Sequence, residues 1–410
     1  MPPFIERNFR IMIKSKEIKE VLKYIIKFSG YSISKIFLND HYELLRETGK
    51  LKPYYQKGSS FFGYYDSSPE NGYGDVLCNI TNSSTKKHPK ETSNIEVGLF
   101  KKGNFENPDF KFETRAFNWQ QGARLMWLDN EKFIYNDFNH MDGFISIIRD
   151  RHGKIIKKIE FPHSYSRGNQ IFGLNYDLIK KIDPDYGYDQ NDPRESDISQ
   201  TTIINYLKLD DENSQMKLNV EELQENFGER DSALNHAVLS PDNKKMSIIQ
   251  RRLRNNNRQD RLLIFSLNQE NSFSFSELIG YCEISHYCWL DNNRILLYMK
   301  PENNKWGFYR LDIASKSLVK EGKLSGYLDG HPSFQEGNLI FDCYSTIFGF
   351  QKIFLMQGKS NVKEVLSLFN PPSFWGSSRC DFHPRFSADG KYLFFDSVRS
   401  GKRQLYRLEL

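Results

Sequence analysis

The sequence of 410 residues lacks the features of membrane-spanning and secreted proteins. It has no run of about 18 apolar residues, which a helix needs to cross a bilayer. Its five cysteines are an odd number without the spacing of a disulfide framework, which favours a reducing compartment. Residues 1–7 contain no cationic segment leading into an apolar run, so we expect no secretion signal. These absences predict a soluble, cytoplasmic protein.

An excess of positive charge is found only in the N-terminal segment. Residues 1–60 hold 12 Lys and Arg against 6 Asp and Glu, which leaves 45 against 46 for residues 61–410. Because phosphate binding needs a basic face, this nearly neutral main part argues against nucleic acid as a partner.

The basic N-terminal segment has the pattern of an amphipathic helix. Over residues 14–28 one helical stripe is apolar and lysines occupy the other positions, the apolar residues being Ile18, Val21, Leu22, Ile25 and Ile26. Such a stripe can pack on the rest of the protein or on a second subunit. It can also contact an anionic membrane surface at the inner face of the membrane. We expect residues 1–55 to form this helical extension.

A β-hairpin unit recurs along residues 56–410. Its best copy has the polar turn Ser387-Ala388-Asp389-Gly390 before an apolar run, and Asp and Gly suit the positive φ of a tight hairpin. Similar turns fall near residues 70, 129, 168, 242, 291 and 337. Most steps approach the roughly 40–50 residues of a four-stranded propeller blade. The sequence therefore predicts an all-β protein, a seven-bladed β-propeller.

Five of the nine histidines occupy equivalent places in this repeat. Each stands five or six residues before its turn: His163, His236, His286, His331 and His383. In a propeller the innermost strands run along the central axis, so these positions meet at one mouth. A histidine there can be a hydrogen-bonding strut, or the set can form a functional site.

Other polar residues are expected at the same mouth. The ends of the second strands and the first two blades contribute Tyr64, Tyr65, Gln121, Arg124, Asn136, His140, Arg251 and Arg252. The result would be a polar funnel rich in imidazole, guanidinium and phenol groups, and we expect it to bind the substrate.

A metal site is one chemistry that fits this funnel. Cys380 and His383 have the short Cys-x-x-His spacing, and His286 and His331 come from neighbouring blades. Imidazoles with a thiolate suit zinc in a tetrahedral site. The sequence thus predicts His286, His331, Cys380 and His383 as ligands.

Acid–base catalysis on an anionic ligand is the second chemistry that fits the funnel. His140 and His163 can exchange protons near neutral pH, and Arg251 or Arg252 can pair with a carboxylate through two hydrogen bonds. These are the parts needed for β-elimination from a uronic acid. The carboxylate is neutralised, the neighbouring carbon loses a proton, and the leaving glycosidic oxygen gains one.

The chain resembles the seven-bladed propeller polysaccharide lyases of the ulvan lyase and oligogalacturonate lyase type, from about residue 60 to residue 410. The resemblance rests on these segments: Phe62-Gly63-Tyr64-Tyr65-Asp66, Gln120-Gln121-Gly122-Ala123-Arg124, Tyr135-Asn136-Asp137, Tyr186-Gly187-Tyr188, Asn235-His236, Ser285-His286-Tyr287-Cys288-Trp289, Gly330-His331-Pro332 and Arg379-Cys380-Asp381-Phe382-His383-Pro384.

The resemblance implies an oligosaccharide or polysaccharide in the funnel, elimination at a uronate, and a divalent ion, zinc or manganese. It gives the base or acid role to His140 and His163 and carboxylate neutralisation to Arg251, and it adds Tyr188 to the substrate contacts. It also implies the same metal ligands as the spacing does. Where the ulvan type has a catalytic tyrosine, this chain has Asn235, and His236 beside it is a further catalytic candidate.

The leading hypothesis is therefore a metal-containing lyase acting on uronate-containing oligosaccharides. One alternative is a non-catalytic glycan-binding or scaffold protein in the assembly of a surface polysaccharide. Another is a transferase or hydrolase, which would need a carboxylate at the centre of the funnel; Asp137 and Asp142 are the early candidates.

Overall fold

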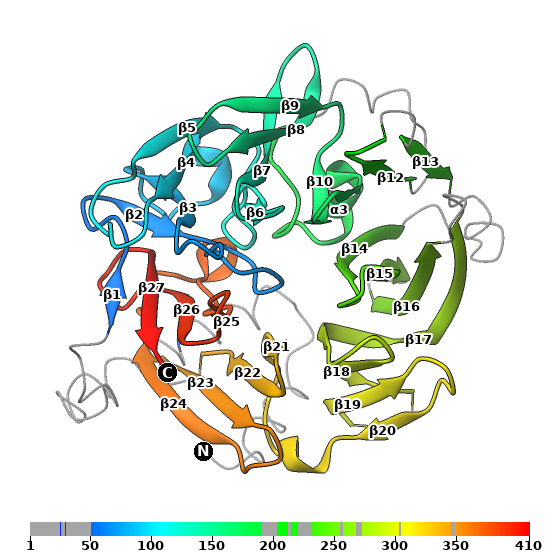
Figure 1. Ribbon diagram of the computed structural model, residues 1–410. Coiled ribbons are helices and arrows are strands. Elements are labelled where there is room, and N and C mark those ends of the chain that lie inside the picture. Colours follow the sequence, from blue (N-terminus) through cyan, green and yellow to red (C-terminus); the bar gives the residue numbers. More distant parts are fainter. Residues whose placement is uncertain are drawn as a thin grey trace.

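The computed structural model describes residues 51–190, 203–211, 215–219, 232–254, 257–267, 273–302, 305–345 and 349–410, together with Ile25 and Ser29 (Figure 1). Ile25 and Ser29 are helical, and Ile25 is half exposed. The rest of the predicted amphipathic helix at residues 14–28 lies outside the described residues. Within the part of the chain that is described, no helix is long and apolar enough to cross a membrane.

The described strands form antiparallel sheets that follow one another around a ring (Figure 1). The first has β2 (Ser59–Phe61), β3 (Val76–Thr81), β4 (Ile95–Phe100) and β5 (Phe110–Thr114). The second has β6 (Met126–Trp127), β7 (Lys132–Asn139), β8 (Gly143–Asp150) and β9 (Ile155–Ile159). The third has β10 (His163–Arg167), β11 (Gln170–Gly173), β12 (Ile203–Lys208) and β13 (Met216–Asn219).

A longer sheet then follows, made of β14 (Ser232–Leu239), β15 (Lys245–Arg254), β16 (Asn257–Leu267), β17 (Phe273–Trp289), β18 (Arg294–Lys300), β19 (Gly307–Asp312) and β20 (Leu318–Lys320). The next sheet has β21 (Ser333–Gln335), β22 (Asn338–Cys343), β23 (Phe350–Gln357) and β24 (Lys363–Phe369). The last joins β25 (Arg385–Phe386), β26 (Tyr392–Ser397) and β27 (Gln404–Glu409) to β1 (Lys52–Pro53). The described helices are α3 (Tyr176–Ile182) and the short 3-10 turns η2 (Pro89–Glu91), η4 (Gly322–Leu324) and η5 (Gly376–Ser378).

The long sheet consists of two consecutive units that share β17. The first part of β17 pairs with β16 up to Cys282, and the second part pairs with β18 from Glu283 onward. Each unit is thus an antiparallel sheet of four strands like the others. The predicted β-propeller is confirmed by this succession of sheets around one axis.

The predicted hairpin turns join the innermost strands to the strands that follow them. In the turn before β15, the Ser240 hydroxyl donates to Asp242 at 2.6 Å and accepts from the Lys245 N–H at 3.0 Å. Asn243 there and Gly390 in the last sheet have positive φ values of 59° and 70°. This is the local turn chemistry that the sequence pattern indicates.

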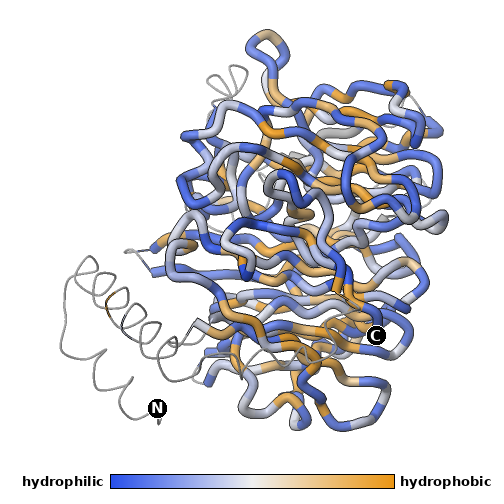
Figure 2. Tube along the Cα trace, turned by 90° about the vertical axis from the view of Figure 1, so that its left-hand side faces the viewer, coloured by the Kyte–Doolittle hydropathy of each residue, from blue (hydrophilic) through white to orange (hydrophobic). Residues whose placement is uncertain are grey.

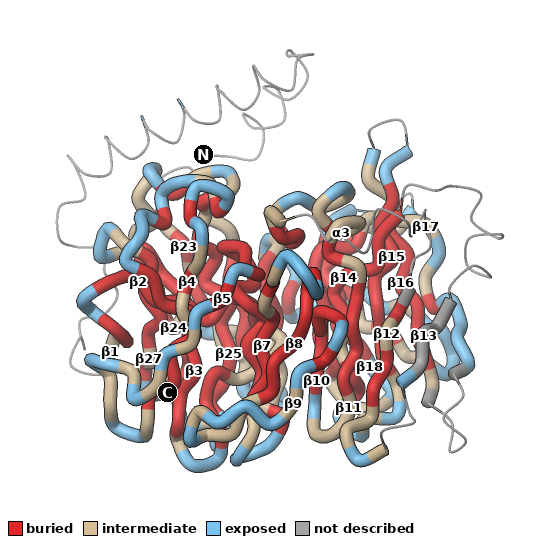
Figure 3. The backbone as a smooth tube through the Cα atoms, turned by 90° about the horizontal axis from the view of Figure 1, so that it is seen from above, coloured by how far each residue is buried: buried red, intermediate tan, exposed pale blue. Residues whose placement is uncertain are grey.

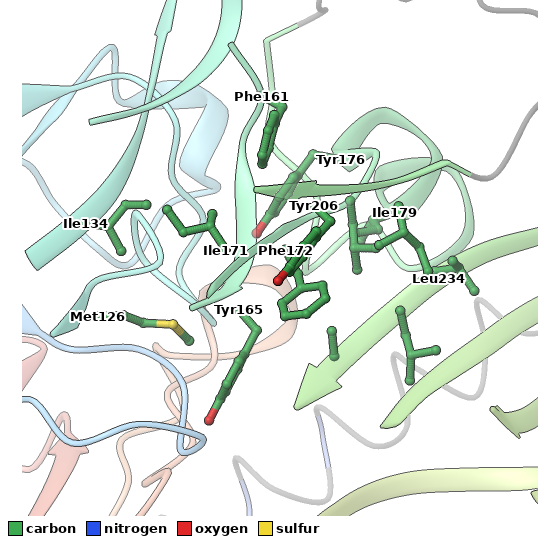
Figure 4. Packing of buried hydrophobic residues seen from close by; sticks show 14 of the residues in the cluster. Met126, Ile134, Phe161, Tyr165, Ile171, Phe172, Tyr176, Ile179, Tyr206 and Leu234 are labelled. Carbon is green, nitrogen blue, oxygen red and sulfur yellow. The ribbon is translucent and has the colours of Figure 1, made fainter. Parts of the chain in front are cut away.

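Apolar side chains fill the space between neighbouring sheets. Figure 2 shows hydrophobic residues mainly along the strands, and Figure 3 shows that the strands are buried whereas the connecting turns are exposed. In the cluster of Figure 4, Met126 and Ile134 meet Tyr165 and Ile171, so the second and third sheets share one core. Burial between sheets, rather than within any one sheet, therefore holds the ring together.

The ring is closed by pairing the start of the described chain with its end. Lys52 and Pro53 of β1 pair with Arg407 and Tyr406 of β27. Tyr54 follows, is 2% exposed, and its ring centroid lies 5.5, 4.7 and 6.3 Å from those of Phe100, Phe105 and Phe394. The chain thus enters the propeller a few residues before the boundary at residue 55 that the sequence predicts.

His163 is a strut between the second and third sheets. It is fully buried, its Nε2 lies 2.7 Å from the Arg124 carbonyl oxygen, and its Nδ1 lies 3.2 Å from Ser146 Oγ. Its backbone N–H donates to Asn136 Oδ1 at 2.9 Å. Burial and the charge of Arg124 lower the pKa of His163 to about 3. The side chain is therefore neutral and fully engaged in the framework.

Tyr54→Ala is expected to destabilise the closure. Removing this buried ring from between Phe100, Phe105 and Phe394 leaves a cavity, and we expect the free energy of unfolding to fall by about 3–5 kcal/mol. Met141→Ala, at a residue that is 91% exposed, should change it by less than about 0.5 kcal/mol. Urea unfolding measures both, and equal stability of the two variants would contradict the closing role of Tyr54.

The neutral state of His163 should make stability depend on pH. The unfolded histidine binds a proton below about pH 6.5, whereas the folded one does so only near pH 3. Its contribution is thus fully present above the unfolded pKa and is lost as the pH falls. Between pH 7 and pH 5 it should cost about 2 kcal/mol of the free energy of unfolding. In His163→Gln the decrease in the free energy of unfolding between pH 7 and pH 5 should be smaller by this amount. In His152→Gln, at an exposed turn, the decrease should equal that of the wild type. If His163→Gln and the wild type lost the same free energy over this pH range, the role of His163 as a neutral strut would be refuted.

Candidate functional site

Four histidines gather where the inner strands begin. His236 lies in β14 and His286 in β17, and His331 and His383 stand just before β21 and β25. Their ring centroids follow one another at 5.8, 4.1 and 4.2 Å, and each residue is at most 3% exposed. We call these four residues the histidine row. His163 is in the same sequence register, but its side chain is held by Arg124 and Ser146.

Tyr64 and Tyr65 complete the wall around the row. The Tyr64 ring centroid lies 5.3 Å from those of both His236 and His383, and its hydroxyl contacts His236 Nδ1. The Tyr65 ring lies 5.4 Å from that of His331, and its hydroxyl donates to the Tyr287 carbonyl at 3.0 Å. The two phenols predicted for the funnel are therefore in contact with the row.

A glycine allows the two tyrosines to reach this place. Gly63 has φ +106°, and a Cβ on it would lie 2.5 Å from the Gln121 backbone. The N–H groups of Phe62 and Gly63 donate to the two Asp396 carboxylate oxygens at 3.0 and 2.9 Å. The segment that carries Tyr64 is thus pinned between the first and last sheets.

A buried carboxylate orients His331. Its Nδ1 lies 2.9 Å from Asp342 Oδ1, and the same carboxylate accepts from the N–H groups of His331 at 2.7 Å and His383 at 3.1 Å. Burial alone would lower the pKa of His331, but the charge of Asp342 outweighs it and raises the pKa. Because Nδ1 faces Asp342, Nε2 is the atom left for a ligand.

Three buried residues can hold a metal ion. Ligand atoms of His331, Asp381 and His383 lie within 4.8 Å of one another. Among the described residues, Nε2 of His331 and Nε2 of His383 have no hydrogen-bond partner. Buried polar atoms are rarely left unpaired, and two imidazole nitrogens with one carboxylate suit zinc or manganese. The donor set therefore fits a divalent cation.

The structure places Asp381, rather than Cys380, in this group. Cys380 packs with Phe374 and Val398 in a small apolar cluster. Burial raises the pKa of its thiol to about 12. His286 is next to the group, 4.1 Å from the His331 ring, and its Nδ1 lies 3.3 Å from Asp329 Oδ1.

Arg251 and His236 form a second polar centre at the other end of the row. The Arg251 Nη1 donates to His236 Nε2 at 3.2 Å, and its Nε donates to Asp260 at 3.1 Å. Arg251 also pairs with Asp183. Burial and then the charge of Arg251 lower the pKa of His236 well below its usual value. His236 is therefore a neutral imidazole beside a guanidinium and a phenol.

Four predicted substrate contacts are engaged inside the framework. Arg124 pairs with Asp66 at 2.8 Å, and Asn136 Nδ2 donates to the Tyr188 hydroxyl at 2.8 Å. The Tyr188 ring stacks on that of Tyr176 at 4.1 Å. Gln121 is 5% exposed, and its N–H donates to Asn118 at 2.7 Å. The Arg124, Asn136 and Tyr188 side chains thus bond to neighbouring parts of the framework, and Gln121 is buried beside Asn118.

The remaining two predicted residues lie apart from the row. His140 is exposed in the turn between β7 and β8, with its ring 5.4 Å from that of Phe138. The Arg252 guanidinium lies 3.6 Å from the Tyr281 ring centroid, and its Nε donates to Gln259 at 3.0 Å. Arg251 and Arg252 are neighbours in β15, and only Arg251 contacts the row.

Several carboxylates of the site were not predicted. Asp329 accepts from Ser285 at 2.6 Å beside His286, and burial raises its pKa to about 6. Asp342 lies in the second strand of its sheet. The only available signal was proximity in sequence, because Asp329 stands two residues before His331 and Asp381 two before His383.

A cavity of about 650 Å³ occupies the hairpin-turn end of the channel. It is lined by residues from several sheets, among them Tyr65, Tyr165, Trp289 and Phe334. Tyr65 contacts the histidine row as well. Tyr65 therefore lies between this cavity and the histidine row.

No protein-family model and no curated protein matches the chain. Solved structures with a similar fold are found. An oligogalacturonate lyase in complex with manganese is 12% identical, with 86% of this chain and 90% of that chain covered at a TM-score of 0.53. The oligogalacturonate lyase from Vibrio parahaemolyticus is 11% identical, with the same shares covered at a TM-score of 0.52.

The propeller domain of the Trilobed protease from Pyrococcus furiosus is also similar, at 12% identity and a TM-score of 0.49, with 85% of this chain and 96% of that chain covered. Identities this low show the fold alone, and one fold carries many activities. The chain is a β-propeller similar in fold to oligogalacturonate lyases.

Proposed function

We propose that this protein is a metal-dependent lyase that cleaves uronate-containing oligosaccharides by β-elimination at the histidine row. One observation carries the proposal: His331, Asp381 and His383 bring ligand atoms within 4.8 Å of one another, the Nε2 atoms of the two histidines have no hydrogen-bond partner, and a neutral His236 stands in the same histidine row. The manganese in the solved oligogalacturonate lyase supports a divalent ion. Manganese and zinc both suit the donor set.

His331, Asp381 and His383 would hold the ion. When bound there, it would neutralise the uronate carboxylate and so make the neighbouring C–H more acidic. Asp342 holds the His331 ring in the orientation that presents Nε2. These protein groups therefore set the place of the reacting carboxylate.

His236 and Tyr64 would move the protons. His236 is neutral, and its Nε2 accepts a hydrogen bond from Arg251 in the free protein. Once a bound uronate draws the Arg251 guanidinium away, Nε2 would take the proton from the carbon next to the carboxylate. Burial raises the pKa of Tyr64 well above its usual value, so this phenol keeps its proton and can give it to the leaving glycosidic oxygen. A C=C bond forms as the C–O bond breaks. The contact between Tyr64 and His236 then returns the proton to the phenol, and no other reactant is consumed.

The proposal also includes the number of blades, the location of the protein and the role of His140. Counting the two units of the long sheet separately gives seven blades. We propose a cytoplasmic protein whose N-terminal helix contacts a membrane surface or a second copy. His140, exposed in the turn between β7 and β8, would contact the glycan at the edge of the funnel.

A non-catalytic glycan-binding role is the second candidate. It is favoured by the ion pairs of Arg251, whose guanidinium already pairs with Asp183 and Asp260. An arginine neutralised in this way is less able to stabilise a developing charge. Such a protein would bind a uronate glycan and release it unchanged.

Metal analysis tests the donor set. We expect about one zinc or manganese per chain in the purified protein, and its loss in His331→Ala, Asp381→Asn and His383→Ala. Cys380→Ala, at the neighbouring position, should retain the metal because its thiol lies in an apolar cluster. Metal lost from Cys380→Ala and kept by Asp381→Asn would instead support the ligands predicted from sequence.

A lyase assay tests the chemistry. Mixing the metal-loaded protein with uronate oligosaccharides should give an ultraviolet-absorbing unsaturated product. His236→Ala and Tyr64→Phe should each lower kcat at least about 100-fold while retaining the metal. His152→Ala, at an exposed turn, should keep full activity. Glycan binding without product, unaffected by His236→Ala, would support the non-catalytic role instead.

A further inference from the structure

Two arginines stand at opposite ends of the histidine row. Arg251 donates to His236 at 3.2 Å, at the first end. Arg379 donates from Nε to Asp381 at 3.0 Å, and Asp381 groups with His331 and His383 at the other end. The row is thus bracketed by two positive charges.

Each arginine has one inner and one outer carboxylate partner. The inner side chains, Asp260 and Asp381, are 0% and 6% exposed. The outer ones are Asp183 on Arg251 and Asp185 on Arg379, and they are 24% and 33% exposed. Breaking a buried pair leaves an unpaired charge and is costly, whereas a carboxylate that already touches water can be hydrated. The outer partners are therefore the replaceable ones.

Both outer carboxylates come from one tripeptide, Asp183-Pro184-Asp185, directly after α3. Pro184 restricts the backbone between them. The loop is held by backbone groups, since the Tyr186 N–H donates to the Asp183 carbonyl at 3.0 Å and Asn118 donates to the Tyr186 carbonyl at 3.0 Å. The two carboxylates can thus rotate toward water while the loop stays in place.

The loop lies at the end of the ring where the proposed site is. The hydroxyl of Tyr176 in α3 donates to the carbonyl of His163 at the start of β10, at 3.1 Å. The Tyr186 ring lies 5.2 Å from that of His236 and 5.8 Å from that of Tyr64. A ligand beside the histidine row would therefore meet Asp183 and Asp185 directly.

We propose that Arg251 and Arg379 are two subsites for acidic groups, and that Asp183 and Asp185 occupy them in the free protein. A ligand with two neighbouring carboxylates replaces both aspartates, so the number of ion pairs is conserved. A ligand with one carboxylate replaces only one of them. This inference rests on the proposed function and names its substrate class, a glycan with at least two consecutive uronate residues.

The internal aspartates explain how two arginines stay beside neutral histidines before the ligand arrives. Without its outer aspartate, each guanidinium would have one carboxylate partner instead of two in this largely buried wall, which is costly. The aspartates hold each arginine in position for bidentate pairing. They also exclude weak competitors, since an anion must compete with a carboxylate that is already placed there.

Binding measurements test the exchange. Titration calorimetry with digalacturonate and with galacturonate compares the wild type with the double variant Asp183→Asn/Asp185→Asn. With both competitors removed, digalacturonate should bind about tenfold more tightly and galacturonate less than about threefold more tightly. Asp189→Asn is the matched control, because Asp189 follows on the same loop but pairs with Lys180 and His88. Its affinities should equal those of the wild type.

Unchanged or weaker binding of digalacturonate by the double variant would overturn the inference, as would a variant that only loses thermal stability. Binding and catalysis separate the two proposals. Tighter binding without any unsaturated product retains the subsites and refutes the lyase. Product formation with unchanged affinity retains the lyase and refutes the subsites. The metal content of the double variant, expected to equal that of the wild type, checks that the Asp381 group is intact.

Discussion

The carboxylate of Asp342 is the buried charge around which the candidate site is built. It accepts three hydrogen bonds, from the N–H and Nδ1 of His331 and from the N–H of His383, at 2.7 to 3.1 Å. It thereby ties the segments before β21 and β25 to β22. Gly330 makes this possible, because a Cβ there would lie 1.8 Å from the Asp342 carbonyl oxygen. A buried carboxylate without these donors would be costly, so the fold and the orientation of both histidines depend on one another.

Burial gives the site its chemical character. It lowers the pKa values of His236 and His383 and keeps both rings neutral. A neutral imidazole can bind a metal ion or accept a proton. The positive charges of Arg251 and Arg379 are balanced by aspartates, so the wall holds arginines and neutral histidines together. The same low-polarity surroundings would strengthen each charge interaction with a bound uronate.

The repeat and the register of the histidines could be predicted from the sequence because both depend on local chemistry. Turn residues such as Asp242 and Gly390 act over a few positions, and equivalent places on inner strands meet at one end of a propeller. The register could not separate His163 from the other histidines. Its partners are Arg124, just before β6, and Ser146 in β8, and no sequence signal links them to His163.

The choice between Cys380 and Asp381 shows a further limit. The two residues are adjacent, and which of them faces the histidines depends on the local backbone, where His383 has a positive φ of 45°. Periodicity does not predict such a conformation. Asp183 and Asp185 lie on a loop outside the repeat, so no pattern placed them beside Arg251 and Arg379. Long-range packing decides these two ion pairs.

The most direct test of the central claim is anomalous X-ray diffraction from crystals soaked in Mn²⁺. The account predicts one anomalous peak bonded to Nε2 of His331, Nε2 of His383 and the Asp381 carboxylate. A peak at Cys380, or an ordered site without a peak at saturating Mn²⁺ and Zn²⁺, would contradict it. In that case the two imidazoles would be packing elements of the wall.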